Sequence, residues 1–146
     1  MNLPVLVNID VDDLRRAEDF YRSALDLQVG RRFGESGVEL LGASSALYLL
    51  HKQAGSAPAP GVTQGRDYSR HWTPVHLDFV VPEIGAAVAR AERAGAQLEG
   101  PVRTHAWGRI ALLADPFGHG FCLIEFLGRG YDEIATLAAT TRRSHG

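Results

Sequence analysis

The sequence predicts an α+β protein made of two tandem βαβββ modules whose curved mixed sheets form a cup. The order of predicted strands and helices in the first half of the chain returns in the second half. Sliding the sequence along itself by 70 positions pairs Val11 with Val81 and Gly30 with Gly100. With 146 residues the chain suits one compact domain, so we expect both modules to share a core.

The first module covers residues 3–51. Asp12 or Asp13 can cap a helix that follows the first strand, and a short stretch after this helix ends at Gly30. The helix is predicted from apolar residues at helical spacing, which are Leu14, Ala17, Tyr21, Ala24 and Leu25. The clearest strand candidates of this module are residues 5–11, 38–41 and 46–50.

A connection rich in small residues and proline, residues 52–73, has the composition of an exposed linker. The second module covers residues 74–127. Glu83 favours the positive end of a helix dipole, and Gly95 can end that helix. The apolar face of this helix is formed by Ile84, Ala87, Val88, Ala91 and Ala94. The clearest strand candidates are residues 75–81, 109–113 and 121–126.

The strongest turn signal of the chain is Asp115-Pro116-Phe117-Gly118, between two apolar strands. It predicts a β-hairpin, and His119 inside this turn is expected to face solvent. Residues 128–146 form a C-terminal tail, in which apolar spacing predicts a short helix from Tyr131 to Thr140.

Composition and charge exclude several classes of protein. The single cysteine, Cys122, cannot form an intrachain disulfide, so nothing argues for an oxidising compartment. The N-terminus lacks the basic start of a signal peptide, and no apolar run is long enough to cross a bilayer. A net charge of −2 with scattered basic residues leaves no basic stripe. We therefore expect a cytoplasmic protein that binds neither nucleic acid nor membranes.

Polar side chains occur on the first strand of both modules. Strand alternation places Asn8 and Asp10 on the same side as Leu6, and Asp78 on the same side as His76. A half-solvated strand face would carry the same residues, but these strands meet at the predicted cup, where a ligand can satisfy polar groups. His76 paired with Asp78 or Asp10 could abstract a proton beside a carbonyl. The alternative for His76 is a partly buried residue satisfied by hydrogen bonds.

Other residues are candidates for the pocket wall. Trp107 and Trp72 could form an aromatic wall, because small-molecule pockets combine aromatic side chains with a few polar anchors. Alternatively, they pack between the modules or against a second chain. Cys122 is either a small buried apolar residue or a reactive or metal-binding thiol.

Three segments resemble the vicinal oxygen chelate superfamily, which includes glyoxalase I, bleomycin-resistance proteins and extradiol dioxygenases. The segments are VDDLRRAEDFYRSALDL at 11–27, HLDFVVPEIGAAV at 76–88 and WGRIALLADPFGHGFCLIEF at 107–126. The resemblance covers most of the chain. It implies a single domain of residues 1–146 with the glyoxalase/bleomycin-resistance/dioxygenase fold, and pairing into a homodimer.

In metal-dependent members of that superfamily, each module supplies one metal ligand early in its first strand and one in its last strand. The resemblance places these positions at Leu6, Leu49, His76 and Cys122, all facing the cup. Only His76 is a usual ligand for this site, because leucine has no donor atom and cysteine suits a softer metal than a carboxylate does. The resemblance therefore suggests a divalent metal as cofactor, but these four residues do not supply a complete set of ligands for it.

Two functions fit these observations. The first is binding of a small organic molecule in the cup, by sequestration or with metal-free acid–base chemistry. The second is a metal-dependent lyase, isomerase or dioxygenase of the same superfamily, in which an ion polarises the paired oxygens of a substrate. The second needs ligands beyond His76. The candidate contacts for a small ligand are Asn8, Leu49, Trp72, Trp107 and Cys122.

Overall fold

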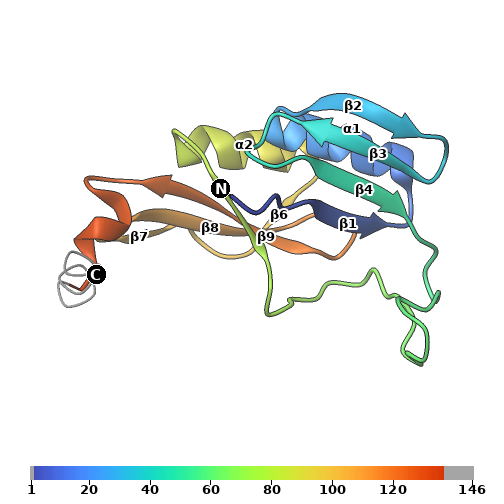
Figure 1. Cartoon of the computed structure of the whole chain (residues 1–146). Helices are drawn as coiled ribbons and strands as arrows, with labels where there is room; N and C mark the ends of the chain where they lie inside the picture. The colour runs from blue at the N-terminus through green and yellow to red at the C-terminus, as the bar shows by residue number, and fades with distance from the viewer. Residues whose placement is uncertain (1, 137–146) are drawn as a thin grey trace.

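The computed structural model describes residues 2–136, which form two mixed β-sheets and two α-helices (Figure 1). The first sheet has strand order β1-β4-β3-β2, and the second has the order β5-β9-β8-β6 with β7 also pairing with β8. Each half of the chain contributes one helix and one sheet, which confirms the predicted fold class. Neither helix is long and apolar enough to cross a membrane in this part of the chain.

The elements are β1 (Val7–Val11), α1 (Leu14–Leu25), β2 (Gln28–Phe33), β3 (Gly37–Leu41), β4 (Leu47–His51), β5 (Leu77–Val80), α2 (Ile84–Ala94), β6 (Gln97–Leu98), β7 (Arg103–His105), β8 (Gly108–Ala114), β9 (Gly120–Phe126) and the 3-10 helix η1 (Gly130–Glu133).

Side chains and turns at the helix ends explain where the helices begin and end. α1 begins after Asp13, whose carboxylate accepts a hydrogen bond of 3.1 Å from the backbone N–H of Arg16. It ends at Asp26, whose φ of 56° is left-handed. α2 begins after Glu83, whose carboxylate caps the first-turn N–H groups, and ends at Gly95 with φ 119°. Asp13 and Gly95 therefore act as predicted, and Glu83 is itself the cap.

A single apolar core joins the two modules. α1 and α2 contact each other, and each packs on one face of its own sheet. Phe20 of α1 lies edge-on to Phe121 of β9, with ring centroids 6.4 Å apart. Buried residues of both sheets, such as Leu49 and Leu123, belong to the same cluster. The modules therefore share one core, as the length of the chain predicts.

Each sheet has a second face that points away from the helices, which we call its open face. Strand pairing identifies it, because paired residues share a face and alternate residues point in opposite directions. On the first sheet, Ile9 and its partner Leu49 pack toward the core, so the neighbouring positions lie on the open face. These are Asn8, Asp10, Tyr48 and Leu50 on the first sheet, and Asp78, Cys122 and Ile124 on the second.

The linker leaves β4, extends away from the modules and returns to β5 (Figure 1). Its last part is fixed against the second module. Arg70 makes two hydrogen bonds of 2.6 Å to the Glu99 carboxylate, and His71 forms an isolated β-bridge with His119. The linker is therefore an external connection whose last part is attached to the second module.

Three details differ from the sequence-based expectation. β2 continues past Gly30 through an irregular register with β3. The corresponding strand of the second module is divided into β6 and β7, and Pro101, which has no N–H to donate, lies between them. The helix expected from Tyr131 to Thr140 is replaced at its start by η1, and residues 137–140 lie outside the described residues.

Candidate functional site

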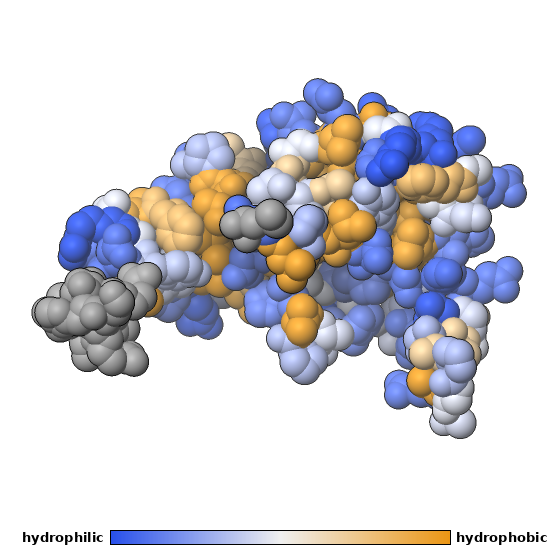
Figure 2. All heavy atoms as spheres, viewed as in Figure 1, coloured by the Kyte–Doolittle hydropathy of each residue, from blue (hydrophilic) through white to orange (hydrophobic). Residues whose placement is uncertain are grey.

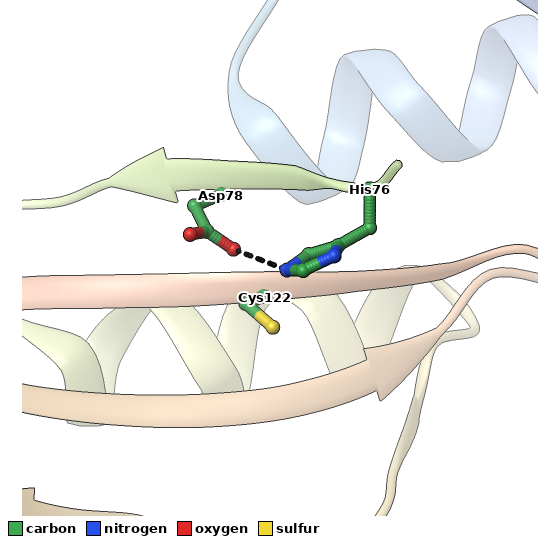
Figure 3. A group of neighbouring side chains, drawn as sticks. All are labelled: His76, Asp78 and Cys122. Carbon is green, nitrogen blue, oxygen red and sulfur yellow. Dashed lines mark ion pairs between the residues drawn. The ribbon is translucent and has the colours of Figure 1, made fainter. Parts of the chain in front are cut away.

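Three side chains gather on the open face of the second sheet, His76, Asp78 and Cys122 (Figure 3). β5 and β9 pair in parallel with Asp78 opposite Cys122, and His76 lies two residues before Asp78. His76 Nε2 lies 3.3 Å from Asp78 Oδ1, and one donor atom of each residue lies within 4.8 Å of the others. His76 and Asp78 therefore lie on one side, as strand alternation predicts, and the pairing adds the thiol.

Two side chains of the cluster are exposed to solvent and the third is buried beneath them. The side chains of His76 and Asp78 are 39% and 37% exposed, whereas Cys122 is only 3% exposed. Cys122 also lies outside the apolar cluster that joins the modules. A solute can therefore reach the imidazole and the carboxylate, with the sulfur as the floor of the site.

The Cys122 thiol is neutral in the metal-free protein. Burial, followed by the charge of Asp78 and a hydrogen bond to it, raises the pKa of Cys122 to about 12. Because the thiolate is the nucleophilic form, the thiol is unreactive near neutral pH. The reactive-thiol alternative is thus not what this environment favours, and Cys122 serves instead as a donor facing Asp78.

Trp72 lies beside the cluster. Its ring is edge-on to His76, with centroids 5.7 Å apart. Its indole N–H donates to Glu99 at 3.2 Å, and the Arg70 guanidinium lies 4.4 Å from the ring centroid. These contacts hold the indole ring next to His76, and Trp72 is not among the residues that line the cavity between β1, β5 and β9.

Trp107 lies elsewhere. Its ring is 5.3 Å from that of Tyr131 and 6.2 Å from that of Phe126, at the end of β9. Phe126 is four residues beyond Cys122, which is about 13 Å along a strand. The expected wall shared by Trp72 and Trp107 does not form around His76, because the two rings flank opposite ends of β9.

The first module places its residues differently from the expectation. Leu49 was expected to face the cup and contact a ligand, but it is fully buried in the core. Its neighbour Tyr48 is on the open face. There it pairs with Asn8 of β1, as Cys122 pairs with Asp78 of β5 in the second sheet. Leu6 precedes β1, is 65% exposed and has no donor atom. Neither leucine can therefore serve as a metal ligand.

An ion pair between the buried Glu39 and the exposed Arg31, whose side chain is 69% exposed, lies on the open face of the first sheet. Glu39 is 6% exposed and accepts hydrogen bonds from the Arg31 guanidinium at 2.7 Å and from the Tyr48 hydroxyl at 2.8 Å. Hydrogen bonds from Arg31, from its side chain and its backbone, are the main cause that lowers the pKa of Glu39 to about 2. Sequence reasoning missed this group, although one acidic residue inside an apolar strand was a usable signal.

A cavity of about 380 Å³ lies between β1, β5 and the start of β9. Asn8 and Asp10 of β1 line it together with His76, which directly precedes β5, whereas Asp78 lies outside its lining. His71 and His119 line it too. The expectation that His119 faces solvent is wrong, because it is half-buried with Nε2 2.7 Å from the backbone oxygen of Asp10.

Asp10 is engaged by another group. Its carboxylate accepts a hydrogen bond of 2.8 Å from Arg66 of the linker, and the Arg66 side chain is 15% exposed. This pairing occupies the carboxylate that was the alternative partner of His76. The residue that does pair with the imidazole is Asp78.

Two βαβββ modules around one core, with polar residues where their first strands meet, define the class of glyoxalase-like folds. Residues 6–124 match the family model of the glyoxalase-like domain. The chain therefore belongs to the glyoxalase-like family, within the vicinal oxygen chelate superfamily. An uncharacterised protein of Mycobacterium bovis is 32% identical over 118 residues, which cover 77% of this chain and 76% of that protein.

Two solved structures illustrate the range of proteins with this fold. A variant of the fosfomycin resistance protein FosX of Listeria monocytogenes, in complex with Mn(II) and 1S,2S-dihydroxypropylphosphonic acid, has a TM-score of 0.64, 17% identity and coverage of 84% of this chain and 88% of FosX. TnmS3, an antibiotic binding protein of Streptomyces sp. CB03234, has a TM-score of 0.63, 23% identity and coverage of 87% and 98%. Both are similar in fold.

Proposed function

We propose that this protein binds a small organic molecule in the cavity between β1, β5 and β9, where His76 exchanges protons with it without a metal. The observation that carries the proposal is the His76–Asp78 pair at 3.3 Å, partly exposed, with His76 lining a cavity of about 380 Å³. Small-molecule sites combine such a hollow with a few convergent polar groups. The antibiotic-binding TnmS3 supports a binding role for this fold.

The chemistry follows from the hydrogen-bond partners. A carboxylate only accepts, so Nε2 of a neutral His76 carries its hydrogen toward Asp78 and Nδ1 keeps a lone pair. Nδ1 can accept a proton from a carbon beside a carbonyl while Asp78 stabilises the imidazolium. The C–H electron pair then forms the C=C bond of an enolate while the carbonyl π pair moves to the oxygen. His76 returns the proton to the same carbon, which restores the carbonyl group and completes an isomerisation at that carbon.

The test is solvent deuterium exchange. Chelator-treated protein is incubated in D2O with α-hydroxy ketones, α-keto acids and aromatic ketones, and loss of the α-proton signal is followed by 1H NMR. We expect exchange with at least one class, reduced about 100-fold or more in His76→Ala. His105→Ala, a histidine of β7 away from the cluster, is the matched control. Absence of both exchange and thermal stabilisation across the panel would refute the proposal.

The three-donor cluster favours a second candidate, a metal-dependent enzyme. One imidazole nitrogen, one carboxylate oxygen and one thiol sulfur within 4.8 Å fit the pattern of three protein ligands with an open position. Sulfur favours Zn²⁺ over Mn²⁺, the ion in FosX. His76, Asp78 and Cys122 would hold the ion, which when bound would supply polarisation of a substrate carbonyl.

Metal content separates the two candidates. Protein purified without chelator is offered Fe(II), Mn(II), Ni(II) and Zn(II), and bound metal is measured for the wild type, His76→Ala and Cys122→Ser. Because the thiol must lose its proton, binding at this cluster should strengthen as pH rises. Metal held by the wild type and lost in both variants would favour the metal-dependent enzyme. Equal metal content in all three would leave the metal-free proposal.

We also propose that the chain pairs as a homodimer. The open face of the second sheet leaves Val80, Leu112 and Phe126 between 37% and 60% exposed. Figure 2 shows apolar side chains at the surface over β8 and β9. Exposed apolar side chains gathered on one face of a sheet are typical of a protein contact.

A further inference from the structure

A pair of histidines, His71 and His119, is held in a fixed position apart from the cluster at Asp78. His71 lies near the end of the linker and His119 directly precedes β9, and their backbones form a parallel β-bridge. The His71 N–H donates to the Gly118 oxygen at 3.0 Å. Gly118 has a φ of 87°, and a Cβ there would collide with the carbonyl oxygen of Ser69, so glycine allows this close approach.

The other side of the bridge is fixed by the hairpin turn. The Asp115 carboxylate accepts hydrogen bonds from the backbone N–H groups of Phe117 at 2.8 Å and His119 at 2.9 Å. Asp115 is itself buried and accepts a further hydrogen bond from the Tyr21 hydroxyl. Both imidazoles are therefore carried by backbone that tertiary contacts hold in place.

The outer nitrogen of each ring has a carbonyl partner. His71 Nδ1 lies 2.8 Å from the Ser69 oxygen, and His119 Nε2 lies 2.7 Å from the Asp10 oxygen. A carbonyl oxygen only accepts, so both outer nitrogens carry the hydrogen. In neutral rings the inner nitrogens, His71 Nε2 and His119 Nδ1, then both carry lone pairs. These two nitrogens are 3.4 Å apart, with no hydrogen to join them.

We propose that His71 and His119 bind a divalent transition metal ion, of the Zn²⁺ class, between these inner nitrogens. Zinc–nitrogen bonds are about 2.0–2.1 Å, so two ligands of a tetrahedral zinc ion lie about 3.3–3.4 Å apart. The observed separation is 3.4 Å. Metal-binding histidines also characteristically donate their other N–H to a carbonyl or carboxylate, as both rings do.

The remaining coordination positions lie toward the cavity. His71 and His119 both line the cavity of about 380 Å³, which leaves room for water or for a ligand with an oxygen donor. In the described part of the chain, the only group of three or more His, Cys, Asp or Glu donors is the one at Asp78. The site is therefore an open two-histidine site that uses neither His76 nor Asp78 as a ligand, although His76 lines the same cavity.

The first test uses the full chain with Zn²⁺ as the probe. His76→Ala removes the neighbouring cluster, and calorimetric titration measures Zn²⁺ binding to this variant with and without His71→Gln or His119→Gln. We expect one Zn²⁺ per chain in the His76→Ala background and at least about tenfold weaker binding after either further substitution. His105→Gln in the same background should change nothing. No binding in the background, or binding unaffected by both substitutions, would overturn the proposal.

The second test needs no substitution. In 15N-histidine-labelled wild-type protein at alkaline pH without metal, we expect His71 as the Nδ1–H tautomer and His119 as the Nε2–H tautomer. Zn²⁺ should then shift His71 Nε2 and His119 Nδ1. The opposite tautomers, or unchanged shifts with excess Zn²⁺, would overturn the site. Zn²⁺ lost only with His76→Ala would instead support the metal-dependent candidate above, so failures at the two sites are distinguishable.

Discussion

Replacement of Tyr21 by Phe tests how the two modules are joined. Tyr21 lies on α1 of the first module, 2% exposed, and its hydroxyl donates to Asp115, 6% exposed, in the hairpin turn of the second. A hydrogen bond to a charged group contributes about 1.5–3 kcal/mol. The ring and its edge-on contact with Phe20, at 4.8 Å, remain in the variant, so no cavity adds to the cost. We expect Tyr21→Phe to lower the free energy of unfolding by about 1.5–3 kcal/mol.

Equilibrium urea unfolding measures this change. The matched control is Tyr131→Phe, because Tyr131 is 50% exposed, and substitutions at such positions change stability by less than about 0.5 kcal/mol. Equal stability of Tyr21→Phe and wild type would refute the conclusion that this bond joins the modules. Because Asp115 also orients the backbone of His119, the variant should in addition weaken Zn²⁺ binding at the histidine pair.

The pH dependence of the free energy of unfolding, compared between wild type and Tyr21→Phe, gives a second measurement. Burial, followed by the charge of Asp115 and the hydrogen bond to it, raises the pKa of Tyr21 well above its usual value of 10. Tyrosine in the unfolded chain ionises near pH 10, whereas the buried phenol stays protonated, so wild-type stability falls above that pH. Tyr21→Phe has no such group and should lose less stability between pH 9 and about 11. Parallel curves would contradict the assignment.

Three further predictions concern the open faces. Cys122 should react slowly with iodoacetamide at pH 7.5, and Asp78→Asn should accelerate the reaction, because Asp78 helps to raise the thiol pKa to about 12. Intact mass spectrometry measures the extent of alkylation over time. Fast alkylation of the wild type would contradict the raised pKa. The lowered pKa of Glu39 stabilises the fold above about pH 4.5, and this contribution is lost as pH falls toward 2. Urea midpoints should therefore fall less on acidification in Glu39→Gln than in wild type, and equal falls would exclude this role. Leu112→Asp should give a monomer in light scattering where the wild type is a dimer; an unchanged mass would place the contact elsewhere.

The architecture could be predicted because its signals are local. Asp13 caps the start of α1 and Gly95 the end of α2 through contacts within a few residues, and the Asp115 turn closes on its own backbone at Phe117 and His119. The internal repeat then fixed the order of the elements without knowledge of which strands pair. Boundaries failed where the reason was not local, as in β2, which continues past Gly30 by pairing with β3.

The facing of Leu49 could not be predicted because β4 has apolar residues on both faces. In Leu47-Tyr48-Leu49-Leu50 both alternations are apolar, so the pattern does not show which side meets the helices. The structure resolves this through Leu47 and Leu49, which are buried in the core, while Tyr48 turns to Glu39. When the direction of a side chain is inferred by counting from a distant motif, an error of one residue in the strand register reverses it.

The histidine pair was inaccessible to sequence reasoning for a different reason. His71 and His119 are 48 residues apart and belong to a linker and a turn, two segments without periodicity. Their contact depends on a single β-bridge and on a close approach at Gly118. The same holds for Cys122, whose place beside Asp78 follows from the register of β5 and β9 and not from its spacing in the chain.

Corresponding positions of the two modules carry different chemistry. Asn8 pairs with Tyr48 in the first sheet as Asp78 pairs with Cys122 in the second, so strand pairing places equivalent positions on equivalent faces. The repeated backbone thus determines where side chains point, and the residue at each position determines what they can do. The first sheet carries the Glu39–Arg31 ion pair on its open face, whereas the three metal-type donors lie on the open face of the second sheet. Under the proposed function, substitutions at Glu39 or Arg31 should therefore alter stability, and those at His76 or Asp78 should alter proton exchange.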